Sequence, residues 1–105
     1  MTQLSKGQEE RIQEAVKQRI EDYSVERPND INFSFAISNP EDRDHIVRIG
    51  TSILCTRWEI GYPGGSFAQA IANNNLMETF GRADAINLKC IQFYVSLIYN
   101  QSYIE

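Results

Sequence analysis

The chain has 105 residues, of which 42% are hydrophobic and 23% are charged, and it carries a formal net charge of −4. These values are typical of one folded domain and exclude an intrinsically disordered chain. An acidic chain has no general attraction for DNA, RNA or an anionic membrane surface, because such binding requires positive charges that neutralise phosphates. A local basic pocket for a small anion is compatible with this composition.

The first predicted element is an amphipathic helix over residues 1–23. Ser5 can cap this helix, with Gln8 three residues later as the second half of a capping box. Apolar residues recur at helical spacing from Ile12 to Tyr23, and the opposite face is charged or polar. This pattern is typical of a peripheral helix that packs on a core, or of an arm that packs on a second subunit.

Residues 31–37 follow a different pattern, in which apolar residues alternate with small or polar ones; the apolar set is Ile31, Phe33, Phe35 and Ile37. A period of two predicts a short β-strand. A single strand cannot satisfy its own backbone hydrogen bonds, so it needs a partner. The partner could be a second copy across a dimer axis or an extended segment over 54–60. An irregular extended segment laid along the helices is the third interpretation.

The next segment begins with a strong helix start. Asn39 can cap a helix whose first residue is Pro40, with acidic residues in its first turn. Apolar residues at helical spacing extend this helix to about residue 59. Glycine and proline residues over 61–65 then end it, and Ser66 can cap the next helix.

Asparagine interrupts that third helix at 73–75, because its side chain competes for backbone hydrogen bonds. A short turn of helix follows and stops at Gly81. Asp84 can cap a final helix from 85 to about 100, which is apolar over a broad face and is the best candidate for the centre of the core.

These elements predict a mainly α fold. We expect one compact domain over 1–105 with four to five helices, in which residues 40–100 form the helical core and 31–37 is the one short β-strand.

The turn formed by Pro63, Gly64, Gly65 and Ser66 is the first candidate binding feature. Backbone amides and the positive end of a helix dipole at such a turn suit an anion. It is not a phosphate loop, because no lysine follows the glycines. The alternative is a plain tight corner followed by a serine cap.

Arg57, Trp58 and Tyr62 lie next to that turn. An arginine beside aromatic rings can hold a purine by stacking and a phosphate by a bidentate contact. The alternative places Trp58 in the core and leaves Arg57 and Glu59 as a solvated pair.

A second polar group surrounds Gly81. Asp84 as a helix cap, with Arg82 as its ion-pair partner, explains these residues without a ligand. Arg82 could instead meet Arg57 in space. The full set of candidate ligand-binding residues is Arg57, Trp58, Tyr62, Gly64, Gly65, Ser66, Arg82 and Asn87.

Catalysis and metal binding are not indicated. The single histidine, His45, is placed by no catalytic motif, and the acidic residues lie at helix starts and on charged faces. Cys55 and Cys90 lack a companion at metal-ligand spacing, so we expect two buried thiols. The sequence therefore predicts a protein that is not an enzyme and needs no metal or cofactor.

No secretion signal or membrane span is indicated either. Met1 is followed by polar residues, and no apolar run approaches the roughly 18 residues that a span requires. We expect a cytoplasmic protein.

Several motifs in the second half of the chain carry a resemblance: Tyr62-Pro-Gly-Gly-Ser-Phe, Phe80-Gly-Arg-Ala-Asp84 with Asn87, and Leu97-Ile-Tyr-Asn100. This stretch resembles a group of small proteins encoded by bacteriophages and prophages. The group commonly has a Gly-Gly-Phe turn, an Asn-Asp-Leu helix end, an Arg-Ala-Asp-x-x-Asn corner and a closing Leu-Tyr-Asn. This sequence departs at Ser66, which separates the glycines from Phe67, and at Asn75, where an acid is usual.

The resemblance implies a phage or prophage origin and a helical fold, but it implies no activity. Small phage proteins commonly bind and disable a host component. By that analogy we expect a homo-oligomer in the host cytoplasm that sequesters a small anionic ligand, a nucleotide, with a cyclic nucleotide of antiviral signalling as one specific form.

The alternative is a protein–protein interaction module that inhibits or docks on a host or phage protein through 31–37 or the first helix. A third hypothesis, a small DNA-associated regulator, is disfavoured by the acidic charge.

Overall fold

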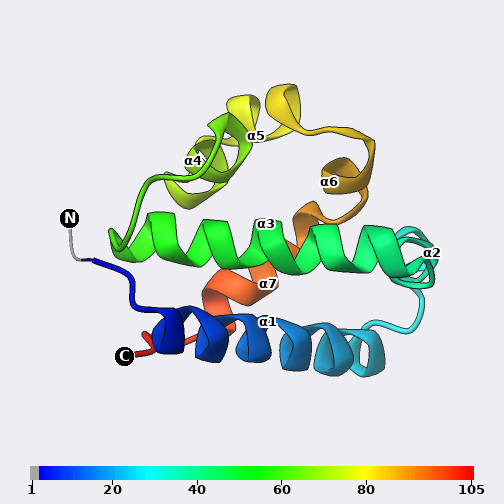
Figure 1. Ribbon diagram of the computed structural model, residues 1–105. Coiled ribbons are helices and arrows are strands. Elements are labelled where there is room, and N and C mark those ends of the chain that lie inside the picture. Colours follow the sequence, from blue (N-terminus) through cyan, green and yellow to red (C-terminus); the bar gives the residue numbers. More distant parts are fainter. Residues whose placement is uncertain (1–2) are drawn as a thin grey trace.

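The computed structural model describes residues 3–105 and contains seven helices in that range (Figure 1). They are α1 (Lys6–Glu26), α2 (Ile31–Ile37), α3 (Pro40–Trp58), α4 (Ser66–Ala72), α5 (Leu76–Arg82), α6 (Ala85–Lys89) and α7 (Ile91–Asn100). The mainly α prediction is confirmed, but the expected number of four to five helices is wrong. The additional helices are α2 and the one created when the expected final helix divides at Cys90.

The prediction of a β-strand over 31–37 is wrong, because this segment is the helix α2. Asp30 starts the helix by accepting a hydrogen bond from the Phe33 amide at 3.1 Å. The helix buries Phe33 and Ala36, which are three residues apart, and leaves Ile31 and Phe35 exposed. The alternating apolar pattern therefore does not mark two faces of a strand.

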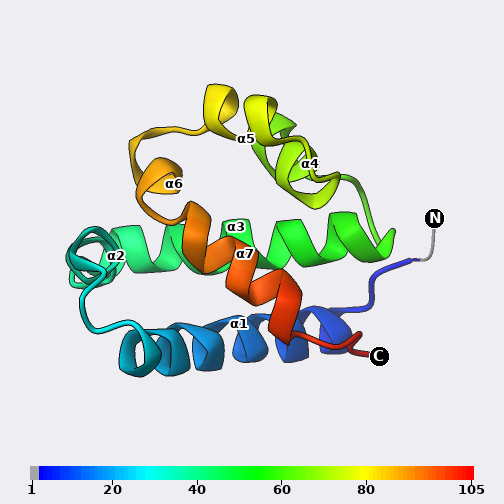
Figure 2. The same cartoon turned by 180° about the vertical axis from the view of Figure 1, so that it is seen from behind.

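The helix α3 lies at the centre of the fold and contacts α1, α2, α4, α6 and α7. Figures 1 and 2 show α1 on one side of α3 and the short helices α4 and α5 on the other. The expectation that the last helix forms the centre of the core holds only in part, because α7 shares this place with α3.

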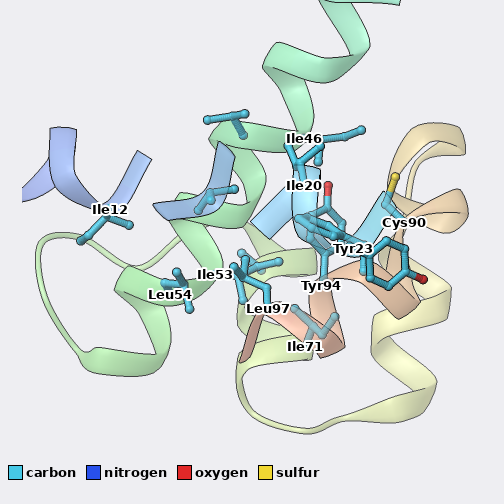
Figure 3. Close-up of a cluster of buried hydrophobic side chains, with 14 of the residues drawn as sticks. Ile12, Ile20, Tyr23, Ile46, Ile53, Leu54, Ile71, Cys90, Tyr94 and Leu97 are labelled. Carbon is cyan, nitrogen blue, oxygen red and sulfur yellow. The ribbon is translucent and has the colours of Figure 1, made fainter. Parts of the chain in front are cut away.

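Buried apolar side chains from most of the helices meet around α3 and α7 (Figure 3). Three aromatic rings join α1, α2 and α7 in this core. Phe33 stacks on Phe93 with ring centroids 4.8 Å apart, and Tyr23 meets both rings edge-on. Aromatic pairs in these geometries contribute about 0.5–1.5 kcal/mol each beyond their burial.

The start of α1 confirms one part of its prediction and corrects another. Ser5 caps the helix by accepting a hydrogen bond from the Gln8 amide. The Gln8 side chain does not complete a capping box. It donates instead to the Tyr103 hydroxyl at 3.2 Å and to the Ile104 carbonyl at 2.8 Å, so it attaches the end of the chain to α1.

The glycine turn between α3 and α4 is a tight corner packed on α3. The Gly64 amide donates to the Thr56 hydroxyl at 2.9 Å, and a Cβ on Gly64 would lie only 2.1 Å from the Ser52 hydroxyl oxygen. This close approach requires glycine at position 64. The prediction that Ser66 caps α4 is wrong, because Gly65 occupies the cap position and Ser66 is the first helical residue.

The later helix boundaries largely follow their polar residues. Asn39 and Asp84 cap α3 and α6 as predicted. Asn75 caps α5 by accepting from the Glu78 amide at 3.1 Å, so the break in the asparagine run is confirmed. The helix α5 continues through Gly81, where the sequence predicted a stop. No helix in the part of the chain described here is long and apolar enough to cross a membrane.

Candidate ligand-binding cleft

A cleft of about 410 Å³ opens between α5 and α7, over the C-terminal part of α3. Its lining comes from four helices and one turn: Arg57 of α3, Ile71 of α4, Asn74 of the α4–α5 turn, Leu76 and Thr79 of α5, and Ile91, Val95, Ile98 and Tyr99 of α7. Cavities of this size can hold a small organic ligand.

The cleft exists because α5 and α7 pack on different neighbours. The helix α5 packs chiefly on α4, whereas α7 packs on α1 and α3. The turn that leads into α5 places Asn74 in the left-handed region with a φ of 60°, a conformation that asparagine tolerates better than most residues. Thr79, on the buried side of α5, donates to the Asn75 carbonyl at 2.6 Å and satisfies its own hydroxyl.

The walls of the cleft are mostly apolar. Ile71 is buried at its base, and Ile91 and Ile98 are half-buried along α7. Leu76 and Tyr99 stand at the edge and are 71% and 85% exposed. Such a lining favours a ligand with an aromatic or aliphatic part.

Of the residues that the structure describes, Arg57 is the only charged one that lines the cleft. One of its terminal nitrogens, Nη1, donates to the Ala72 carbonyl at 2.9 Å, so the guanidinium is anchored at the C-terminal end of α4. No carboxylate within residues 3–105 forms an ion pair with it. A guanidinium has five N–H donors in a planar fork that matches carboxylate and phosphate oxygens. The cleft thus combines one uncompensated positive charge with an apolar wall.

The aromatic residues predicted near Arg57 have other positions. Trp58 is half-buried, and its ring meets the Tyr103 ring edge-on with centroids 5.2 Å apart. Tyr62 is 94% exposed on the turn after α3. Neither residue lines the cleft.

Ser66 and Arg82 line a separate, shallow depression on α4 and α5, together with Gln69 and Glu78. The two glycines of the turn line neither this depression nor the cleft. The Arg82 Nε donates to Glu78 at 2.8 Å, and this hydrogen bond raises the pKa of Arg82. The charge of Arg82 is therefore compensated, and Arg82 does not share a concavity with Arg57.

The predicted ion pair between Arg82 and Asp84 is wrong. Asp84 instead faces His45 at 3.3 Å, and this contact links α6 to the start of α3. The histidine thus has a structural neighbour between two helices rather than an exposed position.

Asn87 lies in the core. It is 4% exposed, and its side-chain oxygen accepts a hydrogen bond from the Tyr94 hydroxyl at 3.0 Å. Burial raises the pKa of Tyr94. Asn87 therefore satisfies a buried tyrosine, a role that explains a polar residue in the core without a ligand.

Both cysteines are buried free thiols, as the sequence predicted. Burial, with a smaller contribution from Asp30, raises the pKa of Cys90 to about 12, and burial also raises that of Cys55. Within residues 3–105 no three histidine, cysteine or acidic side chains lie close enough together to hold a metal ion.

Of the predicted site residues, the structure brings Arg57 alone to the cleft. Sequence reasoning missed Asn74, Tyr99 and the other α7 residues. A signal for the latter was present, because residues 91, 95, 98 and 99 recur at helical spacing and form a second apolar face beside the one that the core uses.

Comparison of the chain with protein-family models, curated proteins and solved structures found no match. The interpretation of the cleft therefore depends on its own chemistry.

Proposed function

We propose that this protein is a non-catalytic binding protein that takes a small anionic ligand, a nucleotide, into the cleft between α5 and α7. The observation that carries the proposal is the guanidinium of Arg57 at an otherwise uncharged and mostly apolar cleft. A ligand with one anionic and one aromatic end matches both halves of this lining.

Three residues of the cleft offer different contacts to a nucleotide. Arg57 keeps N–H donors beyond the one that bonds Ala72, and a phosphate oxygen is a strong acceptor for them. The exposed ring of Tyr99 offers a stacking surface for a base, and the branched side chains of α7 exclude water from its other face. Asn74 adds an amide that can donate to or accept from a ring edge.

The resemblance to small phage proteins decides which nucleotides to test first. A phage protein that sequesters a host signal would act as a homo-oligomer in the host cytoplasm, and the cyclic nucleotides of antiviral signalling are ligands of the required chemistry. Linear nucleotides form the comparison set.

Native mass spectrometry of the purified protein, alone and with linear and cyclic nucleotides, tests this proposal. We expect a complex that carries the intact mass of a nucleotide. Since hydrogen bonds to charged groups contribute about 1.5–3 kcal/mol, Arg57→Ala should weaken the affinity by roughly 10- to 100-fold. Arg48→Ala removes an exposed arginine of α3 that does not line the cleft, and should leave the affinity unchanged.

Three results would count against the proposal. Failure to bind any nucleotide would remove the proposed ligand class. Loss of binding in Arg82→Ala but not in Arg57→Ala would move the site to the separate depression on α4 and α5. Conversion of the nucleotide into a product would show an enzyme.

The second candidate is a module that docks on a host or phage protein through α2. The observation that favours it is the exposure of Ile31 and Phe35, at 77% and 71%, with the Lys89 ammonium 5.3 Å from the Phe35 ring centre. Because this segment is a helix, the mode of docking would be a helix in a groove rather than strand addition. A pull-down from host lysate with the wild type and with Phe35→Ser distinguishes the two candidates. If the protein docks through α2, the wild type should retain a host or phage protein that Phe35→Ser does not retain.

A further inference from the structure

We infer that the surface formed by α5 and α7 is the site where a second copy of this chain packs. We call this surface the α5–α7 face; its exposed members are Leu76, Met77 and Phe80 of α5 and Val95 and Tyr99 of α7. The inference names the contact surface of the homo-oligomer in the proposed function, and it rests on that proposal only for the existence of an oligomer.

The face is unusually apolar for an exposed surface. Leu76, Met77 and Tyr99 are 71%, 84% and 85% exposed, and Phe80 is half exposed. Leu76 and Phe80 are four residues apart, so they lie on the same side of α5. Leu76, Val95 and Tyr99 border the same cleft, so the α5 and α7 parts adjoin each other. In the view of Figure 2, α7 runs across the front of the molecule with α5 above it.

The size of the face matches an interface. An aromatic side chain presents about 150–250 Å² when fully exposed and an aliphatic one roughly half of that, so at the observed exposures the five side chains present roughly 450 Å² of apolar surface. A standard stable interface buries about 800 Å² on each partner, of which a little more than half is non-polar. The α5–α7 face therefore lies in the range of a dimer contact.

The charges of the molecule point to a second copy as the partner. The ten residues of α7 contain no charged side chain. In a two-fold dimer the same patch packs on itself, so an uncharged patch buries no unpaired charge on either copy. The two charged side chains of α5, Glu78 and Arg82, form an ion pair with each other. The helix α1, in contrast, exposes charged side chains of both signs, and packing a second copy there would remove them from water.

Sedimentation velocity over a range of protein concentrations tests the inference, with Met77→Lys as the variant and Val25→Lys as its matched control. Both positions are strongly exposed, at 84% and 80%, but Val25 lies on α1. Met77 does not line the cleft, so the ligand contacts stay intact. Each substitution makes the net charge less negative, so general repulsion cannot explain a loss of association.

We expect a wild-type dimer, a dissociation constant raised at least tenfold by Met77→Lys, and no change in Val25→Lys. Circular dichroism should show the same helix content in all three proteins. Phe80→Lys, also outside the cleft lining, should act as Met77→Lys does. A wild type that stays monomeric, or a dimer that neither α5 variant weakens, would overturn the inference.

The outcomes separate this inference from the proposed ligand. A dimer that Met77→Lys dissociates but that binds no nucleotide would support the α5–α7 contact and remove the ligand proposal. Nucleotide binding by a protein that is monomeric at every concentration would support the ligand proposal and remove the α5–α7 contact.

Discussion

The helices α1 and α5 use their apolar residues in opposite ways. The apolar stripe of α1 is buried completely, with Ile12, Val16 and Ile20 at 0% exposure, and the other side of the helix is charged. The helix α5 buries only Thr79 and turns its large apolar residues outward. The fold explains the apolar residues of α1, but it does not explain those of α5, and this difference directs the functional proposals to α5 and its neighbour α7.

The largest expected effect tests the contrast directly by removing one phenylalanine from each region. Phe33 is 1% exposed and stacks on Phe93, so Phe33→Ala should lower the free energy of unfolding by about 3–5 kcal/mol. Phe80 is half exposed on α5, so Phe80→Ala should lower it by about 1 kcal/mol or less. Urea unfolding measures both values. Similar losses at the two positions would show that α5 supports the fold as much as the core does.

A smaller effect is expected at the hydrogen bond inside the core. Tyr94→Phe removes the hydroxyl that donates to Asn87 and leaves a buried amide oxygen unsatisfied, which should cost about 1–3 kcal/mol. Tyr99→Phe is the matched control, because that hydroxyl belongs to an exposed ring of the same helix. Thermal unfolding compares the two variants, and equal stabilities would contradict the role given to Asn87.

The buried thiol of Cys90 predicts a dependence of stability on alkaline pH. Burial raises its pKa in the folded protein to about 12, whereas an unfolded cysteine has a pKa of about 8.5. As the pH rises, the unfolded state therefore loses this proton first. The stability that the protonated thiol contributes is complete below about pH 8.5 and is lost as the pH rises toward the folded pKa. Between these values Cys90→Ala should reduce the downward slope by about 1.4 kcal/mol per pH unit. Unfolding measured from pH 8 to 10 checks the slope, and an unchanged slope would contradict the prediction.

The smallest expected effect concerns the cap that places α5 beside the cleft. Asn75→Ala removes the acceptor for the Glu78 amide and should lower stability by about 1 kcal/mol. Asn73→Ala is the control from the same asparagine run, at the end of α4. If α5 forms one wall of the ligand site, Asn75→Ala should also weaken ligand binding. Thermal unfolding measures the loss of stability, and calorimetric titration of the same two variants measures the loss of affinity.

Much of the fold could be predicted from local signals. The caps at Ser5, Asn39 and Asp84 act within a few residues of the chain, and each is where the sequence placed it. The alternating pattern of 31–37 predicts a strand, but the same segment contains the helical pair of Phe33 and Ala36, three residues apart, and it forms a helix. The aromatic contacts of Phe33 with α1 and α7 decide between the two patterns, and they come from distant parts of the chain.

The candidate site could be predicted only in part for the same reason. Arg57 stood out by its neighbours in the sequence, but those neighbours, Trp58 and Tyr62, face elsewhere. Its partners in the cleft, Asn74 and Tyr99, are distant in sequence and are brought together by the packing of α5 on α4 and of α7 on α3. Spacing along the chain carries no information about that arrangement.

The most direct test of the account is a methyl NMR titration of the isoleucine-labelled protein with the tightest nucleotide found by mass spectrometry. Ile71, Ile91 and Ile98 line the cleft, whereas Ile12 and Ile20 are buried residues of α1 and serve as internal controls. We predict that the cleft methyl signals shift in proportion to bound nucleotide and that the control signals stay in place. Saturating nucleotide without a shift at the three cleft isoleucines would contradict the assignment of the cleft as the binding site.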